Sequence, residues 1–591
     1  MEPSEIVLQG RRYCESISGY TLFEDLTWLA EENKWVIKFA LKGDYEPTIF
    51  VPIETNWYAF VSADYPFGSL RILPAMNEGI EATFPHMNYN SDIGKPWRSG
   101  DICVKTNYGS WKNTYFNREP FDVSRLQWSI KRAKAWIYAA ANGTLFSDGD
   151  PFEFPHFTSS IKTRVVFSET SESFSIWSNL TDNGGIMDVF RLPLNNNITV
   201  VNNFYSDTGS IISYEWGIGI SKNQPQLERA LWYKFPEIPI LPPWKMAMNW
   251  GELFNLCKDN GWDLKSFLEN KLIKSKYLDK TKLLVLGFPV SAYIGKPNER
   301  MHWFAIRLPG LIKTLKGFRL NTPEWRQANF SSMFAGHQLI KWLNAENWAK
   351  DQITTRGSLS EELSELNICV IGVGAIGSYL SELLARLGCK RFTLVDEDGV
   401  SIGNFSRHTL SIDSIVRYKA EKVAERLNNI FPHISANSNI LSIQKLISEN
   451  PNFLDQFDLV VDCTAEDNVL QMLELHGISD SQIILSVSVG QEAQSLLAFM
   501  MHYPFKGLFD EFKKKSNEWS ERQKQQFPNP QFPLEGIGCW HPIFPARIDD
   551  LHSLISPVVR QLEIFLSAKD QMKMVIIERD KNGNIIIESK Q

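Results

Sequence analysis

Residues 367–396, NICVIGVGAIGSYLSELLARLGCKRFTLVD, determine the fold of the C-terminal part of this 591-residue chain. An apolar strand, NICVIGVG, leads into the helix AIGSYLSELLARLG, and the strand RFTLVD follows. A strand–helix–strand unit of this kind has a right-handed crossover and belongs to a doubly wound, mostly parallel α/β sheet. A further strand, FDLVVDCT, is predicted at residues 457–464. One face of the predicted helix is apolar: Ile376, Leu380, Leu383, Leu384 and Leu387.

The turn between the first strand and the helix has the pattern Gly-x-Gly-x-x-Gly, formed by Gly372, Gly374 and Gly377. Glycines let the backbone approach a phosphate closely, and the helix N-terminus presents N–H groups and a partial positive charge to it. Asp396 ends the second strand, where a carboxylate can accept hydrogen bonds from ribose hydroxyls. These residues predict a nucleotide site, and they suit NAD as well as ATP.

The residues that follow favour ATP. Arg407 and Lys419 are cations that can clamp the β and γ phosphates, for which a dehydrogenase has no need. Asp462, at a strand end, can hold Mg²⁺ through one carboxylate. Taken singly, each has an ordinary explanation, as a solvated helix charge or a helix cap, but their order and spacing together favour a triphosphate site.

Residues 366–464 resemble the adenylation domain of the ubiquitin-activating and ThiF-type family. A Gly-rich turn, an Asp-x-Asp, an Asn-x-x-Arg, a Lys and an Asp-Cys-Thr occur there in this order. The resemblance implies that Asp396 binds ribose, that Asn404, Arg407 and Lys419 bind the phosphates, and that Asp462 binds the metal. The family's adenylation domains pair, which implies a homodimer, and Arg356 is the candidate for an arginine that the family supplies from the partner subunit.

The N-terminal part has a different pattern. Residues 35–75 alternate polar and apolar positions with Pro and Gly punctuation, which predicts an antiparallel meander. Residues 122–142 predict a helix, and its apolar face is formed by Leu126, Ile130, Ala133, Ile137 and Ala140. We expect an α+β domain over residues 1–160.

This first domain resembles ubiquitin-conjugating domains. The matching residues are Tyr65-Pro66-Phe67, Phe84-Pro85-His86-Met87-Asn88, Gly100-Asp101-Ile102-Cys103, Trp111 and Trp136. The resemblance implies that Cys103 carries a thioester and that Asn88 hydrogen-bonds the oxyanion formed during attack by an amine. The sequence departs from the family pattern at Met87, where Pro is usual, and in the length of the stretch from Asn88 to Cys103. The alternative for Cys103 is a buried structural cysteine.

Between these parts, residues 161–345 mix strand patterns, KTRVVF and KLLVLGFPV, with the helical pattern FNLCKDNGWDLKSFLENKL. They contain no repeat and no catalytic motif, so we expect an α+β linker domain, with a degenerate catalytic domain as the alternative. Residues 346–591 form the predicted adenylation domain. Its segment 505–533 is polar and is predicted to be a long exposed loop.

Seven cysteines without paired C-x-x-C spacing argue against a disulfide scaffold or a structural zinc site. Cys539 lies between glycines and near His541, in the region where activating enzymes carry their thioester-forming cysteine. We therefore predict it to be a nucleophile rather than a buried thiol. Cys369, Cys389 and Cys463 lie in apolar elements and are predicted to be packing residues.

The overall charge excludes some partners. The chain has 61 Lys and Arg against 68 Asp and Glu, a net charge of −7, which gives no chain-wide attraction for nucleic acid or an anionic membrane. The N-terminus lacks a signal-peptide pattern and no apolar run approaches about 18 residues. We expect a cytosolic protein.

The three predicted domains together resemble bacterial fused activating and conjugating enzymes of cyclic-oligonucleotide antiphage (CBASS) systems. The resemblance implies MgATP-dependent adenylylation of a protein C-terminal carboxylate, thioesters on Cys539 and then Cys103, and transfer to a target amine. It also implies a cGAS/DncV-like nucleotidyltransferase as the protein that is activated. The alternatives are a ThiF-type sulfur-carrier adenylyltransferase, a non-catalytic ATP-binding scaffold and, least favoured, an NAD oxidoreductase.

Overall fold

The structure is a computed structural model that divides into two compact units. The first comprises residues 1–191, 195–213 and 226–347, and the second residues 192–194, 214–225 and 348–591. The structure describes the following residues: 2–105, 118–157, 160–207, 209–222, 227–273, 282–312, 315, 317–476, 482–504, 506–529, 532–535, 541–542 and 544–590.

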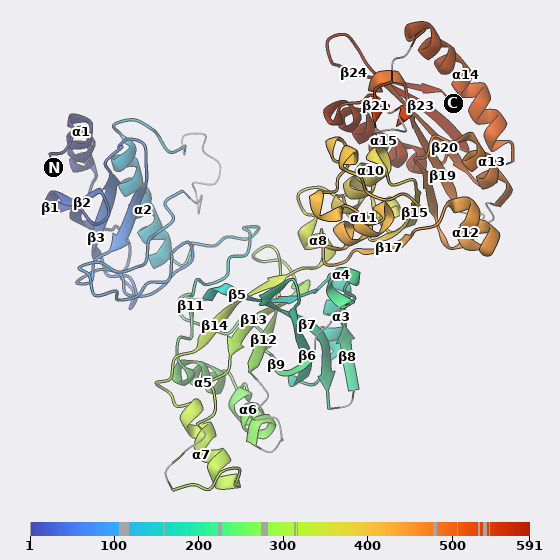
Figure 1. The fold of residues 1–591 in the computed structure, drawn as a ribbon. Helices are drawn as coiled ribbons and strands as arrows, with labels where there is room; N and C mark the ends of the chain where they lie inside the picture. Colours follow the sequence, from blue (N-terminus) through green and yellow to red (C-terminus); the bar gives the residue numbers. More distant parts are fainter. Residues whose placement is uncertain are drawn as a thin grey trace. The chain divides into compact units, whose positions relative to one another are not determined.

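The first unit begins with a four-stranded antiparallel meander, in which the strands lie in chain order (Figure 1). Its strands are β1 (Tyr20–Leu29), β2 (Lys34–Lys42), β3 (Glu54–Ser62) and β4 (Leu70–Pro74). Helix α2 (Arg125–Ala141) buries the predicted apolar face in the same core as the sheet. The predicted meander and helix are confirmed. The sequence patterns missed α1 (Glu5–Tyr13) and β1.

An eight-stranded mixed sheet makes up the rest of this unit, in the order β5-β14-β13-β12-β9-β6-β7-β8. Its strands are β5 (Ser160–Phe167), β6 (Gly184–Leu192), β7 (Asn195–Ser206), β8 (Gly209–Ser213), β9 (Glu228–Lys234), β12 (Leu283–Val290), β13 (Arg300–Arg307) and β14 (Lys341–Asn347). The predicted strands KTRVVF and KLLVLGFPV correspond to β5 and β12. Helices α3 (Ser171–Asn179) and α7 (Pro323–Met333) accompany the sheet.

The helical pattern at residues 254–272 forms two helices. They are α5 (Trp250–Asp259) and α6 (Leu264–Ile273). The break occurs where Asn260 caps α5 and Gly261 takes a left-handed φ of 71°. Glycine is the residue that most readily adopts this conformation after a helix.

The second unit contains the predicted doubly wound sheet, in the order β17-β16-β15-β18-β19-β20-β23-β24. The strands from β17 to β19 are parallel, and the last three are added antiparallel. The parallel strands are β15 (Asn367–Ile371), β16 (Arg391–Val395), β17 (Ser435–Asn439), β18 (Leu459–Asp462) and β19 (Ile483–Val489). The antiparallel strands are β20 (Ser495–His502), β23 (Met572–Arg579) and β24 (Ile585–Lys590).

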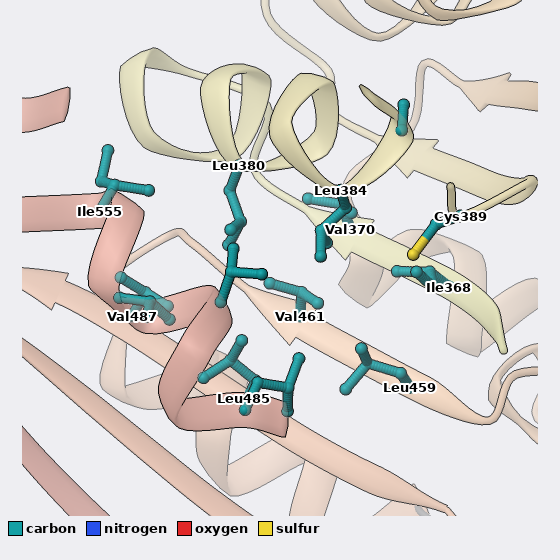
Figure 2. Close-up of a cluster of buried hydrophobic side chains, with 14 of the residues drawn as sticks. Ile368, Val370, Leu380, Leu384, Cys389, Leu459, Val461, Leu485, Val487 and Ile555 are labelled. Atoms are coloured by element: carbon teal, nitrogen blue, oxygen red, sulfur yellow. The ribbon is translucent and has the colours of Figure 1, made fainter. Parts of the chain in front are cut away.

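Helices cover this sheet. Helix α10 (Ala375–Arg386) follows the glycine turn, and α15 (Ile548–Ala568) lies beside it in the core. Figure 2 shows Leu380 and Leu384 of α10 pointing toward the strands and Ile555 of α15 lying in the same cluster. Three further helices of this unit are α11 (Lys419–Asn428), α12 (Ile443–Glu449) and α13 (Asp467–His476). The fold expected from residues 367–396 and 457–464 is therefore confirmed.

The prediction of a long exposed loop at residues 505–533 is wrong. Most of the segment is a 19-residue helix, α14 (Leu508–Gln526). Four buried side chains and the partly buried Trp519 recur every three or four residues and form one narrow stripe. The stripe consists of Leu508, Phe512, Ser516, Trp519 and Gln523. Because two of these five are polar, the helical period was hidden in a polar sequence.

A short piece of the linker region packs with the second unit. Residues 214–222 include helix α4 (Ile218–Ser221), and Gly217 N–H donates to the Pro432 carbonyl over 2.7 Å. Ile218 N–H donates to the Ile434 carbonyl over 3.0 Å. A Cβ on Gly217 would lie 2.1 Å from the Ile434 oxygen, so only glycine allows this close approach.

The predicted domain boundaries at residues 160 and 345 stay predictions, although the second unit resumes at Trp348. Among the described residues, no helix is long and apolar enough to cross a lipid bilayer.

Candidate functional site

Three parallel strands end side by side at the glycine turn. Gly372 N–H donates to the Val395 carbonyl, and Cys463 N–H donates to the Ile371 carbonyl, both over 2.9 Å. Ligands in doubly wound sheets bind outside the carboxyl ends of the strands. The sheet thereby brings Gly372, Asp396 and the Asp462–Thr464 turn to one edge.

The glycines of the turn have different roles. Gly372 has a φ of 79°, which favours glycine, and a Cβ on Gly377 would lie 2.0 Å from the Gly372 oxygen. Both glycines are therefore needed for the conformation of the turn, with or without a ligand. Gly374 is the N-cap of α10, and a Cβ there would meet nothing within 4 Å. The open space beside Gly374 at a helix N-terminus is where a phosphate would be bound.

A cavity of about 400 Å³ opens at this point. Its walls combine the N-terminus of α10 with residues from five further segments of the chain. It is lined by Gly374, Ala375, Ile376, Asn404, Arg407, His408, Lys419, Cys463, Thr464, Ala465, Val489, Phe544 and Leu551. The structure thus brings together the predicted residues Gly374, Asn404, Arg407 and Lys419.

The two predicted phosphate-binding cations are held by protein oxygens. Arg407 donates to the Phe544 carbonyl. Lys419 Nζ lies 2.7 Å from an oxygen of Asp398, whose side chain is 67% exposed. An exposed ion pair is worth little, about 0–1 kcal/mol, so a phosphate oxygen can replace that carboxylate at small cost.

Asp396 holds the glycine turn. One of its oxygens accepts the Val373 N–H over 2.8 Å and the other accepts the Asp398 N–H over 2.9 Å. Burial raises the pKa of this carboxyl above its ordinary value, against the lowering effect of these N–H groups and of Lys419. Asp396 does not line the cavity itself. Its position next to the turn is consistent with the ribose role predicted for it, which stays a prediction.

Asp462 lies at the end of β18, and the metal role predicted for it stays a prediction. Its side chain is fully buried and does not line the cavity. One oxygen accepts the Thr464 hydroxyl and N–H over 2.6 and 3.0 Å, and the other accepts the Ser486 hydroxyl over 2.9 Å. Burial raises the pKa of the Asp462 carboxyl. In this structure the carboxylate orients the Thr464 turn through these hydrogen bonds.

Sequence patterns missed several residues of the cavity wall. His408 is buried, its Nε2 lies 2.8 Å from the Val373 carbonyl, and its Nδ1 accepts the Leu410 N–H. Burial lowers the pKa of this histidine, which suits a neutral ring that braces the glycine turn. Phe544 comes from just before α15, and no sequence signal links it to the turn. His408 directly follows Arg407 in the sequence, and this adjacency was the one sequence feature that could have placed His408 near the predicted phosphate site.

The predicted packing cysteines divide into two groups. Cys369 and Cys389 are buried, and burial raises the pKa of both thiols, to about 12 for Cys389. Cys463 is part of the cavity wall, although burial and the neighbouring Asp462 raise its thiol pKa. Cys539 lies outside the described residues, so its role stays a prediction. Arg356 is exposed and does not line the cavity.

The second predicted nucleophile, Cys103, has an exposed side chain. Cys103 N–H donates to the His86 carbonyl over 2.8 Å, and Asn88 N–H donates to the Asp101 carbonyl over 3.0 Å. Between them Met87 pairs with Ile102 in an antiparallel bridge, and both of these side chains are buried. Since side chains alternate between faces, the exposed Asn88 and Cys103 share the outer face as diagonal neighbours. Diagonal neighbours on adjacent strands are typically about 7–8 Å apart.

The long stretch between these residues is folded away from them. Ser91 N–H donates to the Ser99 hydroxyl over 2.9 Å, and Asp92 pairs with Arg98 in a bridge. The buried Asn90 donates to the carbonyls of Ile80 and Ala82. The extra residues form a pinched loop, and Asn88 and Cys103 stay adjacent in spite of it.

Glu153 fastens the turn that carries Asn88. His86 has a left-handed φ of 58°, which is uncommon for a residue with a side chain. Glu153 accepts the His86 N–H over 3.1 Å, and its other oxygen lies 2.6 Å from His86 Nδ1. Burial opposes ionisation of Glu153, but these contacts prevail and lower its pKa. The carboxylate therefore stabilises the His86 conformation.

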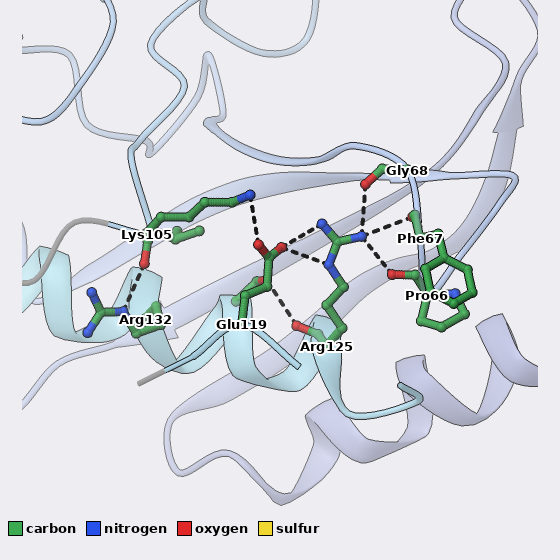
Figure 3. A network of polar contacts seen from close by, with 9 residues as sticks. Pro66, Phe67, Gly68, Lys105, Glu119, Arg125 and Arg132 are labelled. Atoms are coloured by element: carbon green, nitrogen blue, oxygen red, sulfur yellow. Dashed lines mark hydrogen bonds and ion pairs between the residues drawn. The ribbon is translucent and has the colours of Figure 1, made fainter. Parts of the chain in front are cut away.

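An ion pair between Arg125 and Glu119 secures the start of α2 (Figure 3). Arg125 donates two bonds to one oxygen of Glu119, over 2.7 and 2.5 Å, and donates to the carbonyls of residues 66–68. Lys105 lies 2.7 Å from the other oxygen of Glu119. Burial alone would raise the pKa of the Glu119 carboxyl, but the hydrogen bonds from Lys105 and Arg125 outweigh this effect and lower it.

The fold and the cavity define an adenylating protein of the ThiF class, and a ThiF family profile matches residues 347–530. This family binds ATP. The chain is 36% identical over 112 residues to molybdopterin-synthase adenylyltransferase of Escherichia coli (strain K12), which is 18% of this chain and 43% of that protein. E. coli MccB solved with ATP shows 15% identity and a TM-score of 0.27, covering 46% of this chain and 72% of that one.

The rest of the chain determines the particular family. A profile described as the Cap2 central linker domain matches residues 143–348. The ATP-dependent ubiquitin transferase-like protein Cap2 of Enterobacter hormaechei subsp. hoffmannii (strain UCI 50) is 30% identical over 534 residues, 88% of each chain. The chain belongs to the Cap2 family of ATP-dependent ubiquitin transferase-like proteins.

Proposed function

We propose that this chain adenylylates the C-terminal carboxylate of a protein and transfers the acyl group, through thioesters on Cys539 and Cys103, to an amine of a target. One observation carries the first step. The open space at Gly374 lies in the same cavity as Arg407 and Lys419, so a helix N-terminus and two cations converge on one volume. Such an arrangement stabilises the charge that develops on a departing pyrophosphate.

In the first step a carboxylate oxygen of the substrate protein attacks the α-phosphorus of ATP and displaces pyrophosphate. The Cys539 thiolate then attacks the acyl carbon, and AMP leaves. The Cys103 thiolate displaces the Cys539 thiolate. A neutral target amine then displaces the Cys103 thiolate, which takes up the proton that the amine loses. Division into several covalent steps replaces one difficult acylation by easier ones.

Several features support the final step. Cys103 is exposed, and Asn88 lies on the same face. Glu153 holds His86, two residues before Asn88, in place. An amide donor near the acyl carbon would stabilise the oxyanion that forms as the amine attacks. The first domain would act in this step as a ubiquitin-conjugating domain.

The finer assignments are part of the same proposal. The protein that is activated would be a cGAS/DncV-like nucleotidyltransferase in an antiphage system, and the adenylation domains would pair in a homodimer. ATP would act with Mg²⁺, which Asp462 would hold through one carboxylate while the phosphates and water supply the other ligands.

A pyrophosphate-exchange assay with a cGAS/DncV-like nucleotidyltransferase tests the first step. Exchange is expected, and it should disappear when the substrate lacks its C-terminal residues. Absence of exchange in a protein that binds both ATP and the substrate would refute adenylylation.

Non-reducing gels test the later steps. Cys539→Ala should abolish every thioester, whereas Cys103→Ala should retain one on Cys539. If the protein were a ThiF-type sulfur-carrier adenylyltransferase, Cys103→Ala would leave its activity unchanged. If it were an ATP-binding scaffold, it would form no adenylate at all. Cys257→Ala is a suitable control, because Cys257 is buried in the first unit.

A further inference from the structure

A second cavity, of about 900 Å³, lies in the eight-stranded sheet of the first unit. It is formed where β12 and β14 begin and β13 ends, beside β6 and β9, which follow them in the sheet (Figure 1). Its whole lining belongs to the first unit and is separate from the nucleotide cavity. Concave sites for small molecules usually have volumes of about 300–1,000 Å³.

The lining of this cavity is strongly cationic. It contains one carboxylate, Glu228, and five cationic side chains: Arg191, Arg229, Lys282, Arg307 and Lys341. The chain as a whole has a net charge of −7, so this concentration of positive charge is not a consequence of composition.

The strand register places like charges against one another. Arg307 of β13 lies directly opposite Lys341 of β14. On the other side of β13, the Lys282 carbonyl accepts the Leu308 N–H over 2.9 Å, so Lys282 flanks the end of the same strand. Like charges directly opposite on neighbouring strands are destabilising, and a bound anion removes that cost.

These three cations have no carboxylate partner within the described part of the chain. Arg229 differs, because it lies 3.2 Å from Asp188 and its guanidinium stacks 5.3 Å from the Tyr205 ring centroid. Arg229 is therefore held in position at the rim, while Lys282, Arg307 and Lys341 have their donors available for a ligand.

Part of the cavity lining is apolar and buried, and we refer to it as the floor. Its side chains come from four strands or strand ends and from α7, and each is at most 8% exposed: Phe190, Leu283, Leu308, Trp325 and Leu343. A ligand that fits both the cationic side chains and the apolar floor has a planar or apolar body as well as anionic groups. Arginine forks pair with phosphate in a bidentate manner.

We propose that this cavity binds a small organic phosphate with at least two negative charges, as in a nucleoside diphosphate. The phosphates contact Arg307, Lys341 and Lys282, and the body packs on the apolar floor. This site is additional to the adenylation site and does not depend on the function proposed for it.

Calorimetric titration of the full-length protein with ADP tests the proposal. The key variant is Lys282→Gln/Arg307→Gln/Lys341→Gln, and the matched control is Lys258→Gln/Lys265→Gln/Lys296→Gln, which removes three charges from the same unit outside the cavity. The wild type and the control are expected to bind two ADP per chain and the key variant one. Gly374→Ala removes the other ADP, so failure of one site does not imply failure of the other.

Single variants make the test independent of the folding of the triple variant. Arg307→Gln and Lys341→Gln, both at exposed positions, are each expected to weaken the second ADP by about tenfold or more. Unchanged stoichiometry and affinity in these variants would overturn the proposal. Equal competition by inorganic phosphate or by a hexaglutamate peptide would also overturn it, because the cavity would then recognise charge without the organic body.

Discussion

Replacement of Gly374 by alanine separates nucleotide binding from folding. A Cβ at this position meets no atom within 4 Å, and φ is not positive, so the turn accepts it without a clash. Loss of a glycine N-cap costs at most about 1 kcal/mol. Gly377→Ala is the contrasting change, because its Cβ would lie 2.0 Å from the Gly372 oxygen and the turn would have to move.

The effect of Gly374→Ala on ATP follows from the same geometry. The new methyl group occupies the space in which a phosphate meets the N–H groups at the start of α10. If two charge-assisted hydrogen bonds are lost, at about 1.5–3 kcal/mol each, the Kd rises by about 10² to 10⁴.

The assay is calorimetric titration with ATP, together with urea unfolding of the same samples. Gly336→Ala serves as the control, since its nearest neighbour atom would be at an ordinary 3.5 Å and it lies in the linker region. A folded Gly374→Ala protein that binds ATP at this site within about threefold of the wild type would refute the placement of the phosphate.

Three further predictions follow from other parts of the structure. Glu119→Gln leaves the buried Arg125 charge without its carboxylate and should destabilise the first unit by about 3–5 kcal/mol in urea unfolding; a shift no larger than that of the exposed control Glu15→Gln would contradict this. Burial lowers the pKa of His302 to about 3, so an unfolded chain takes up a proton that the folded one refuses, and stability should fall by up to about 2 kcal/mol between pH 7 and pH 5. His302→Phe should remove that part of the pH dependence, and identical losses in both proteins would count against it. Gly217→Ala should release residues 214–222 from the second unit and speed hydrogen exchange of the Gly217 and Ile218 amides, whereas unchanged protection would show that the contact tolerates a side chain.

The sequence identified the elements whose signal is local. The helix after the glycine turn has an unbroken apolar face, and its strands are continuous apolar runs, so the doubly wound sheet was predictable. The gathering of Gly374, Asn404, Arg407 and Lys419 in one cavity followed from order and spacing along adjoining elements. The same was true of α2, whose buried face has strict helical spacing.

Other elements carried too weak a local signal. In α14, polar Ser516 and Gln523 occupy two of the five positions of the inward-facing stripe. The apolar periodicity of the sequence was therefore too weak to predict a helix packed on the sheet. The segment around Gly217 depends on backbone hydrogen bonds to residues more than 200 positions away, which leave no pattern in side chains.

By itself, the amino-acid sequence determined the fold class and the glycine turn, because those depend on residue type and short-range periodicity. The candidate nucleophiles came from the resemblance to activating and conjugating enzymes and stay predictions. Tertiary structure alone decided that Asp462 is turned inward to Thr464 and Ser486, that Glu153 holds the turn before Asn88, and that five cations line one cavity in the linker region. Such features arise from strand register and burial. Both are set by contacts between distant segments, so a linear pattern does not contain them.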